Sequence, residues 1–105
     1  MKQMKLKNII NNIFIKYGLS KSHSKICTDA LINAELVGAP SHGLSRLKMY
    51  CDRISQKVIN PKAIIKIKKI SQSIAHVNAN NSIGFVAADT AIKIAINNAK
   101  KTGIG

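Results

Sequence analysis

The sequence contains few acidic and few aromatic residues. It has four aspartates and glutamates against 17 lysines and arginines, a formal charge of +13, and its only aromatic residues are two Phe and two Tyr. Such a charge is typical of proteins that bind nucleic acid. Two observations weigh against that function, because the cations are scattered through every segment and too few rings are present to stack on bases. A small basic nucleic-acid-binding module is therefore kept as the alternative function.

Cysteine and long apolar runs are also scarce. Cys27 and Cys51 do not form a Cys-x-x-Cys pair. Both fall on the apolar faces of expected helices, so we expect reduced core thiols and neither a disulfide nor a metal site. Asparagine and lysine interrupt every apolar stretch well short of the about 18 residues of a membrane-spanning helix, and the basic N-terminus has no signal-peptide core. These features favour a cytoplasmic protein without a membrane partner.

The first half of the chain shows helical periodicity. The spacing predicts a first helix that ends at Gly18, with an apolar stripe of Leu6, Ile9, Ile10, Ile13, Phe14 and Tyr17. Ser20 or Ser22 would cap a second helix, and His23 near its start is interpreted as a surface residue. The apolar face of the second helix is Ile26, Cys27, Ala30, Leu31, Ala34, Val37 and Gly38.

The second half of the chain predicts a hairpin and a final helix. Residues 65–68 and 73–79 alternate in polarity as half-buried strands do, with His76 facing outward. The short link between them favours an antiparallel hairpin. Ser82 is a candidate cap for a helix from about Ile83, which would end at Gly103. Its apolar face is expected to comprise Ala88, Ala91, Ile92, Ala95, Ile96 and Ala99. No glycine-rich phosphate loop is present.

A polar cluster lies at positions 41–46, after the second helix and at the start of an expected third helix. Ser41 is a good N-cap, and a helix from there would carry His42 and Arg46 one turn apart on one side, with Arg53 further along. The opposite side would be apolar: Leu44, Leu47, Cys51 and Ile54. The positive end of the helix dipole favours a neutral imidazole. A neutral imidazole beside a guanidinium suits proton exchange with a carboxylate-bearing substrate.

Other readings of these residues remain open. The imidazole could be a cap or a surface group, and the two arginines could form a solvated face. Gly43 sits in the first turn, where glycine costs about 1 kcal/mol relative to alanine, and its lack of a side chain could allow a close approach to the backbone. Glu35 could be a solvated charge or could orient a neighbour near His42.

Several segments carry a resemblance to a known family. They are Ala34-Glu35-Leu36-Val37-Gly38, Ser41-His42-Gly43-Leu44-Ser45-Arg46-Leu47, Tyr50 and Ile59-Asn60-Pro61. Together they resemble the malate/L-lactate dehydrogenase family of NAD(P)-dependent enzymes, which includes ureidoglycolate and sulfolactate dehydrogenases and diketogulonate reductase. That family does not use the ordinary Rossmann lactate dehydrogenase fold. One departure is Pro40, where many members carry Asp.

The resemblance covers essentially the whole chain and implies an N-terminal part of a longer enzyme. The expected fold is α+β, with a helical segment over residues 1–60 and the start of a larger mixed-sheet domain over 61–105. The family implies that the intact protein interconverts a 2-hydroxy acid and a 2-keto acid as a homo-oligomer, with a homodimer expected. It implies His42 as general acid/base and Arg46 as the substrate-carboxylate or carbonyl contact; Ser41 and Tyr50 are pocket-lining candidates.

The cofactor NAD or NADP is implied by the same resemblance. No cofactor-binding or metal-binding residue is assigned within the chain, because the nicotinamide and pyrophosphate segments are expected after Gly105. The 105 residues alone are therefore expected to be inactive, since hydride transfer needs the cofactor held against the substrate.

Overall fold

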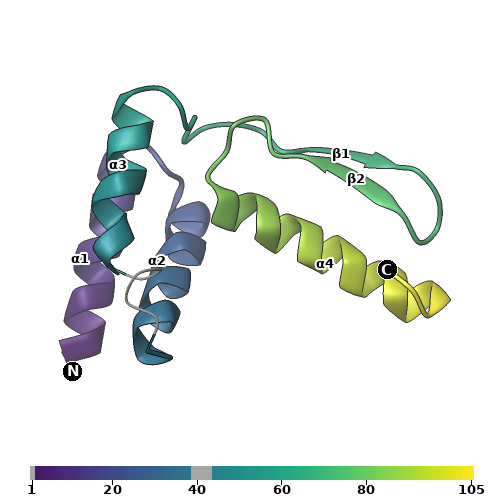
Figure 1. Cartoon of the computed structure of the whole chain (residues 1–105), viewed down its shortest axis with the longest axis horizontal. Coiled ribbons are helices and arrows are strands. Elements are labelled where there is room, and N and C mark those ends of the chain that lie inside the picture. Colours follow the sequence, from purple (N-terminus) through teal and green to yellow (C-terminus); the bar gives the residue numbers. More distant parts are fainter. Residues whose placement is uncertain (1, 39–43) are drawn as a thin grey trace.

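The computed structural model describes residues 2–38 and 44–105. Its elements in chain order are α1 (Lys2–Lys16), α2 (Lys21–Leu36), the 3-10 helix η2 (Leu44–Arg46), α3 (Leu47–Ser55), β1 (Lys66–Lys69), β2 (Ala75–Asn78) and α4 (Gly84–Thr102). Figure 1 shows α1, α2 and α3 gathered at one end, with α4 and the hairpin extending away from them. The predicted α+β class is confirmed.

Local signals fix the junction between the first two helices. Gly18 adopts φ 108°, a conformation that strains residues with a side chain, and it ends the first helix as predicted. Its Cα faces Pro61, so that an added Cβ would lie 3.1 Å from Pro61 Cγ. Ser20 then caps α2, where its Oγ accepts a hydrogen bond from the His23 backbone N–H at 3.2 Å. The predicted cap is confirmed at Ser20.

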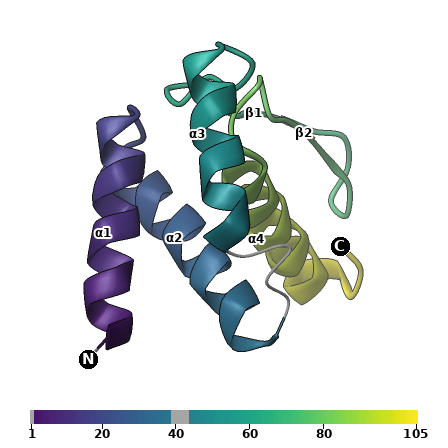
Figure 2. The ribbon, with the colours of Figure 1, turned by 60° about the vertical axis from the view of Figure 1, so that its left-hand side comes forward.

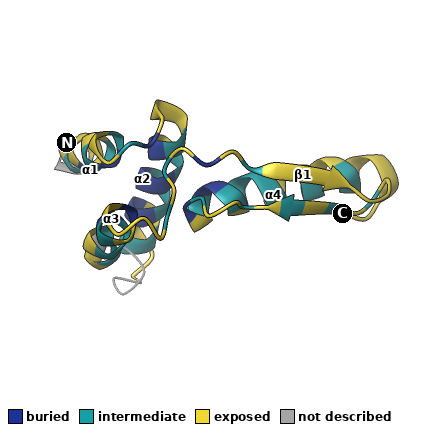
Figure 3. Cartoon of the chain, turned by 90° about the horizontal axis from the view of Figure 1, so that it is seen from above, coloured by how far each residue is buried: buried dark blue, intermediate teal, exposed yellow. Residues whose placement is uncertain are grey.

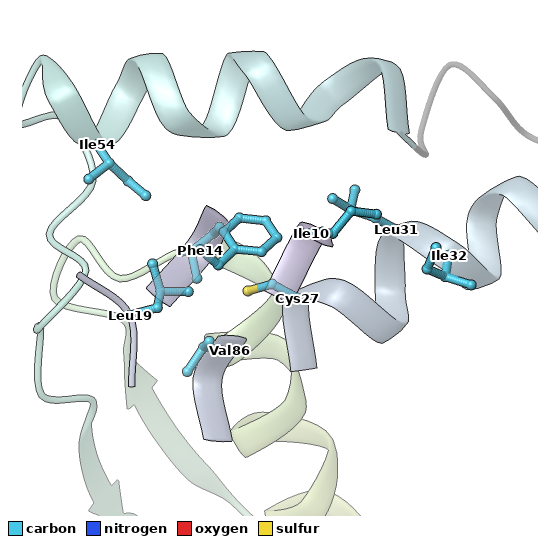
Figure 4. Close-up of a cluster of buried hydrophobic side chains, with 9 residues drawn as sticks. Ile10, Phe14, Leu19, Cys27, Leu31, Ile32, Ile54 and Val86 are labelled. Carbon is cyan, nitrogen blue, oxygen red and sulfur yellow. The ribbon is translucent and has the colours of Figure 1, made fainter. Parts of the chain in front are cut away.

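A single apolar cluster joins the three N-terminal helices to the start of α4. Figure 4 shows Phe14, Cys27, Leu31 and Val86 converging from α1, α2 and α4. Ile54 on α3 belongs to the same cluster, and the residues 83 and 86 at the start of α4 dock into it. Packing against this core therefore holds the C-terminal arm to the helical end.

The apolar stripes predicted for α1 and α2 are wider than the faces that the two helices bury. Ile9 is 56% exposed and Val37 is 70% exposed, whereas the polar Ser24 and Thr28 are buried. The physical reason is geometric, because α1 packs mainly on α2 and a helix covered on one side buries only a narrow face.

The hairpin is antiparallel, as predicted, but its first strand is not half-buried. β1 pairs with β2 in the register Lys66↔Asn78 and Lys68↔His76. All four β1 residues are exposed, while β2 alternates and leaves His76 exposed as expected. Figure 3 shows the exposed surface of β1 along the arm. The contacts to α4 come from β2, so the sheet buries little of β1.

Helix α4 buries only part of the predicted apolar face. Its N-cap is Ile83, with no side-chain cap hydrogen bond, so the predicted cap at Ser82 is wrong. Ala88 is exposed, and Ile92 and Ile96 are 58% and 50% exposed. The face toward β2 carries Ala91 and Ala95 of the predicted set together with Ile94, because two strands cover only one stripe of the helix. The predicted end at Gly103, φ 84°, is confirmed.

The described chain is elongated. It measures 43 × 30 × 23 Å, with a radius of gyration of 15.2 Å, against about 13 Å for a compact domain of this length. Its accessible surface is 7253 Å², against about 5,800 Å² for a compact monomer of this mass. The excess surface belongs to the arm of α4 and the hairpin, which is covered on few sides (Figure 2).

Candidate functional site

Two of the four predicted site residues lie in the part of the chain that the structure describes. Arg46 and Tyr50 are described, whereas Ser41 and His42 lie outside the described residues, as do Pro40 and Gly43. The geometry of the candidate site is therefore described for the Arg46 guanidinium and the Tyr50 phenol ring. Arg46 ends the motif segment on η2, and Tyr50 follows it on α3.

Arg46 lies at the junction of the two short helices. It ends η2 and occupies the N-cap position of α3, with φ −89° and ψ −10° and no side-chain cap bond. The helix α3 begins at Leu47 with a 3-10 turn before it, a common arrangement at helix N-termini, and the predicted cap at Ser41 lies outside the described residues. Arg46 is half-buried, while Arg53 two turns further on is exposed.

Tyr50 lies one turn into α3 and connects this helix to α4. Its ring centroid is 5.3 Å from that of Phe85, with the planes tilted by 60°, a favourable aromatic geometry. Both rings pack against the core cluster together with Leu47. The predicted apolar face of α3 is confirmed at Cys51 and Ile54, which are buried. Tyr50 therefore has a clear packing role, and its predicted role in lining a substrate pocket stays a prediction.

The two thiols are buried on helix faces, as predicted. Burial raises the pKa of the Cys27 thiol to about 12. Burial, and secondly the nearby Asp52 carboxylate, raise the pKa of the Cys51 thiol. Because the thiolate is the reactive form, both groups behave as small apolar residues at neutral pH. Within residues 2–38 and 44–105, no group of three or more His, Cys, Asp or Glu side chains could hold a metal ion.

Sequence reasoning missed a groove beside the junction of α1 and α2. It has a volume of about 570 Å³ and is mostly apolar, lined by Leu19, Pro61 and Ile64 among others. His23 lines it and is half-buried, so its predicted surface position is only partly correct. Gly18 and Pro61 both line the groove and approach each other there, and no sequence pattern signals a contact between positions so far apart.

Among the described residues, no glycine-rich turn leads into a helix N-terminus. Pyrophosphate groups bind where a glycine-rich turn leads into a helix N-terminus. The described glycines with positive φ are Gly18, Gly38 and Gly103, each of which lies within two residues after the end of a helix. The helix starts at Lys21 and Gly84 have serine and isoleucine at their caps.

Comparison with known proteins places the chain in a family. Residues 1–105 match the family described as malate/L-lactate dehydrogenase. The chain is 36% identical to the malate/(S)-sulfolactate dehydrogenase of Methanothermus fervidus and 39% identical to the malate dehydrogenase of Pyrococcus abyssi. These alignments cover 94% and 93% of this chain, but 29% and 27% of the relatives.

The solved structures agree with this assignment. The malate dehydrogenase of Pyrococcus horikoshii OT3 superposes with a TM-score of 0.94 at 34% identity, over 98% of this chain and 30% of that one. The chain belongs to the malate/L-lactate dehydrogenase family. It spans about 30% of the length of the curated relatives that it matches, so the fold it forms is an incomplete version of theirs.

Two further findings bear on partners. No helix in the described ranges is both long and apolar enough to cross a membrane. The family match and the named dehydrogenase relatives give no support to the alternative of a nucleic-acid-binding module. The high positive charge therefore has to be explained within a dehydrogenase family.

Proposed function

We propose that the intact protein is an NAD(P)-dependent oxidoreductase that interconverts a 2-hydroxy acid and a 2-keto acid. The observation that carries this proposal is the family match over residues 1–105, together with the Ser-His-Gly-x-x-Arg segment within it. Relatives over this same stretch are named malate, sulfolactate and ureidoglycolate dehydrogenases. All three names describe substrates with a hydroxyl group beside a carboxylate.

The proposed roles follow from the chemistry of each side chain. His42 would exchange a proton with the hydroxyl or carbonyl oxygen of the substrate, and Arg46 would hold its carboxylate or polarise its carbonyl. The half-buried position of Arg46 supports this role. A guanidinium that is partly shielded from water attracts an anion more strongly than one in open solvent. Ser41 and Tyr50 are the proposed pocket-lining residues.

The remaining parts of the proposal concern cofactor and assembly. The nicotinamide cofactor, NAD or NADP, would accept or supply the hydride, and its binding residues would lie in segments after Gly105. We further propose a homo-oligomer, with a dimer expected. The buried, protonated thiols of Cys27 and Cys51 support a cytoplasmic location, where thiols stay reduced.

The test is a chimera that joins residues 1–105 to the remaining part of the Pyrococcus horikoshii malate dehydrogenase. The chimera should reduce a 2-keto acid with NADH or NADPH, whereas the 105-residue chain alone should not. His42→Ala should lower kcat by roughly 10²–10⁴-fold, the range for loss of a general acid/base. His76→Ala is the matched control, because this histidine is exposed on β2.

Two results would argue against the proposal. A folded chimera with no activity on any 2-keto acid tested would contradict the reaction. Equal kcat values for the two histidine variants would contradict the role of His42. Circular dichroism on each variant separates loss of catalysis from loss of structure.

A further inference from the structure

A second groove runs between α1 and α2, and neither Arg46 nor Tyr50 lines it. Its volume is about 500 Å³, within the range of small-molecule sites. The two helices lie side by side and form its walls (Figure 2). Neither the family match nor the proposed reaction assigns anything to this groove, so the inference drawn from it is independent of the proposed function.

The two walls carry different chemistry. On α2, Lys21, Lys25 and Thr28 line the groove at a spacing that places them on one helix face. On α1, the lining side chains are mostly neutral amides: Asn8, Asn11 and Asn12. Amides and ammonium groups together offer many hydrogen-bond donors to a ligand between the helices.

The groove has an excess of positive charge. Lys7, Lys21 and Lys25 supply three ammonium groups against the single carboxylate of Asp29, a net charge of +2. Asp29 is shared, with its oxygens 3.8 Å from Lys7 Nζ and 2.9 Å from Lys25 Nζ. Lys21 has no ion pair in the described chain. At neutral pH a phosphate monoester carries a charge of about −1.5 to −2, which matches this excess.

A buried hydroxyl supplies a second, independent indication of a ligand. Thr28 is 3% exposed, and its Oγ1 has no hydrogen-bond partner in the described structure. Threonine hydroxyls inside helices usually bond back to a carbonyl one turn earlier. Buried polar groups without partners are rare because they cost free energy. Thr28 lines this groove, and its unpartnered hydroxyl can donate a hydrogen bond to an oxygen of an anion bound there.

We propose that the groove between α1 and α2 binds a phosphate-bearing small molecule. The phosphate would be held by the ammonium groups of Lys21 and Lys25 and by the hydroxyl of Thr28, with the asparagine amides of α1 opposite. Binding would hold α1 against α2 and so stabilise the helical end of the chain, because a ligand that binds only the folded state shifts the folding equilibrium.

The experiment uses the 105-residue chain and inorganic phosphate as the probe, with sodium chloride at matched ionic strength as the reference. Phosphate should raise the melting temperature of the chain above the chloride value. Lys21→Gln should weaken phosphate binding roughly tenfold, as expected for loss of a hydrogen bond from a charged donor. Lys66→Gln is the matched control, since it removes the same charge from the exposed strand β1 and should leave binding unchanged.

Two further variants give results that general charge screening cannot produce. Thr28→Val removes the unpaired hydroxyl at nearly constant shape, so it should raise the melting temperature without phosphate yet reduce the shift that phosphate causes. Asp29→Asn releases Lys7 and Lys25 from their shared carboxylate and should tighten phosphate binding. In amide spectra, the residues shifted by phosphate should lie within 7–15 and 21–29.

The proposal fails under any of three outcomes. Phosphate could stabilise the chain no more than chloride does. The Lys21 and Lys66 variants could lose affinity equally, which would indicate nonspecific attraction to a chain of charge +13. The shifted amides could lie on β1 and not on the first two helices, which would place the anion elsewhere.

Discussion

The ring centroids of Tyr50 and Phe85 lie 5.3 Å apart with the planes tilted by 60°, and this contact joins helix α3, which follows the motif segment, to the start of α4. The residues are 35 positions apart in a chain whose C-terminal arm is otherwise covered on few sides. Aromatic pairs of this geometry contribute about 0.5–1.5 kcal/mol beyond their buried area. The pair therefore couples the stability of the arm to the placement of Tyr50 beside the motif.

The first prediction concerns this coupling. Phe85→Ala should lower the free energy of unfolding by about 2 kcal/mol, less than the 3–5 kcal/mol typical of a fully buried ring, because Phe85 is half-buried. Tyr50→Phe keeps the ring and should change stability by less than about 0.5 kcal/mol. Urea unfolding of the chain measures both values. Ile92→Ala, at an exposed site on the same helix, is the control; an equal loss there would remove the special role of the ring pair.

The second prediction uses the buried thiol of Cys27. Its pKa is raised from 9.0 to about 12 in the folded chain by burial. Below pH 9 the thiol is protonated in both states and adds no pH dependence. Above pH 9 the unfolded chain loses this proton while the folded chain keeps it, so stability falls as pH rises, by up to about 1.4 kcal/mol per pH unit.

The variant Cys27→Ala isolates this effect from the titration of the lysines. It should be less stable than the parent at pH 7, because a buried side chain is shortened. Between pH 9 and 11 its stability should fall less steeply than that of the parent. Urea unfolding at several pH values measures both slopes, and parallel slopes would show that the folded thiol titrates normally.

Some of this fold could be predicted because the signals are local. Gly18 and Ser20 mark the boundary of two helices through their own backbone and side-chain preferences, and both predictions are confirmed. The hairpin follows from alternating polarity and a short link, which neighbouring residues alone determine. Burial was predicted less well. Ile9 and Ile92 are apolar at helical spacing, yet they are exposed because no other element of the chain packs over them.

The candidate site, too, was predicted only where local sequence signals exist. The spacing from Ser41 to Arg46 identified the segment, since a family resemblance needs only the order of residues. The contact of Tyr50 with Phe85 could not be predicted, because it depends on how α4 returns to the helical end. The groove that contains Thr28 was missed for the same reason, as its walls come from two helices whose relative rotation the sequence does not specify.

The third prediction addresses Arg46 in the active chimera. Arg46→Lys should reduce kcat/KM for the 2-keto acid roughly tenfold or more, because an ammonium group cannot reproduce a planar two-pronged contact with a carboxylate. Arg53→Lys is the control for the same change on an exposed part of α3 and should retain the parent value. Steady-state kinetics of both variants tests the assignment, and indistinguishable values would leave Arg46 without a role in substrate binding.

The fourth prediction concerns the uncovered arm. Ile92 and Ile96 are 58% and 50% exposed on α4, and Ile67 on β1 is 54% exposed. The two-stranded sheet leaves strand edges without partners in the described chain, and such edges and apolar patches favour self-association. Light scattering on the 105-residue chain should therefore show a mass that rises with concentration above that of an 11.4 kDa monomer.

A matched pair of variants tests whether self-association depends on α4 or on any exposed apolar residue. Replacing both Ile92 and Ile96 by Gln should shift the chain toward monomer, because it removes apolar surface from α4 without touching the buried core. Ile9→Gln removes a similarly exposed isoleucine, 56% exposed, from α1 at the other end of the chain and should leave the association unchanged. If the Ile9 variant became monomeric and the α4 variant did not, the contact would have to be placed on the helical end.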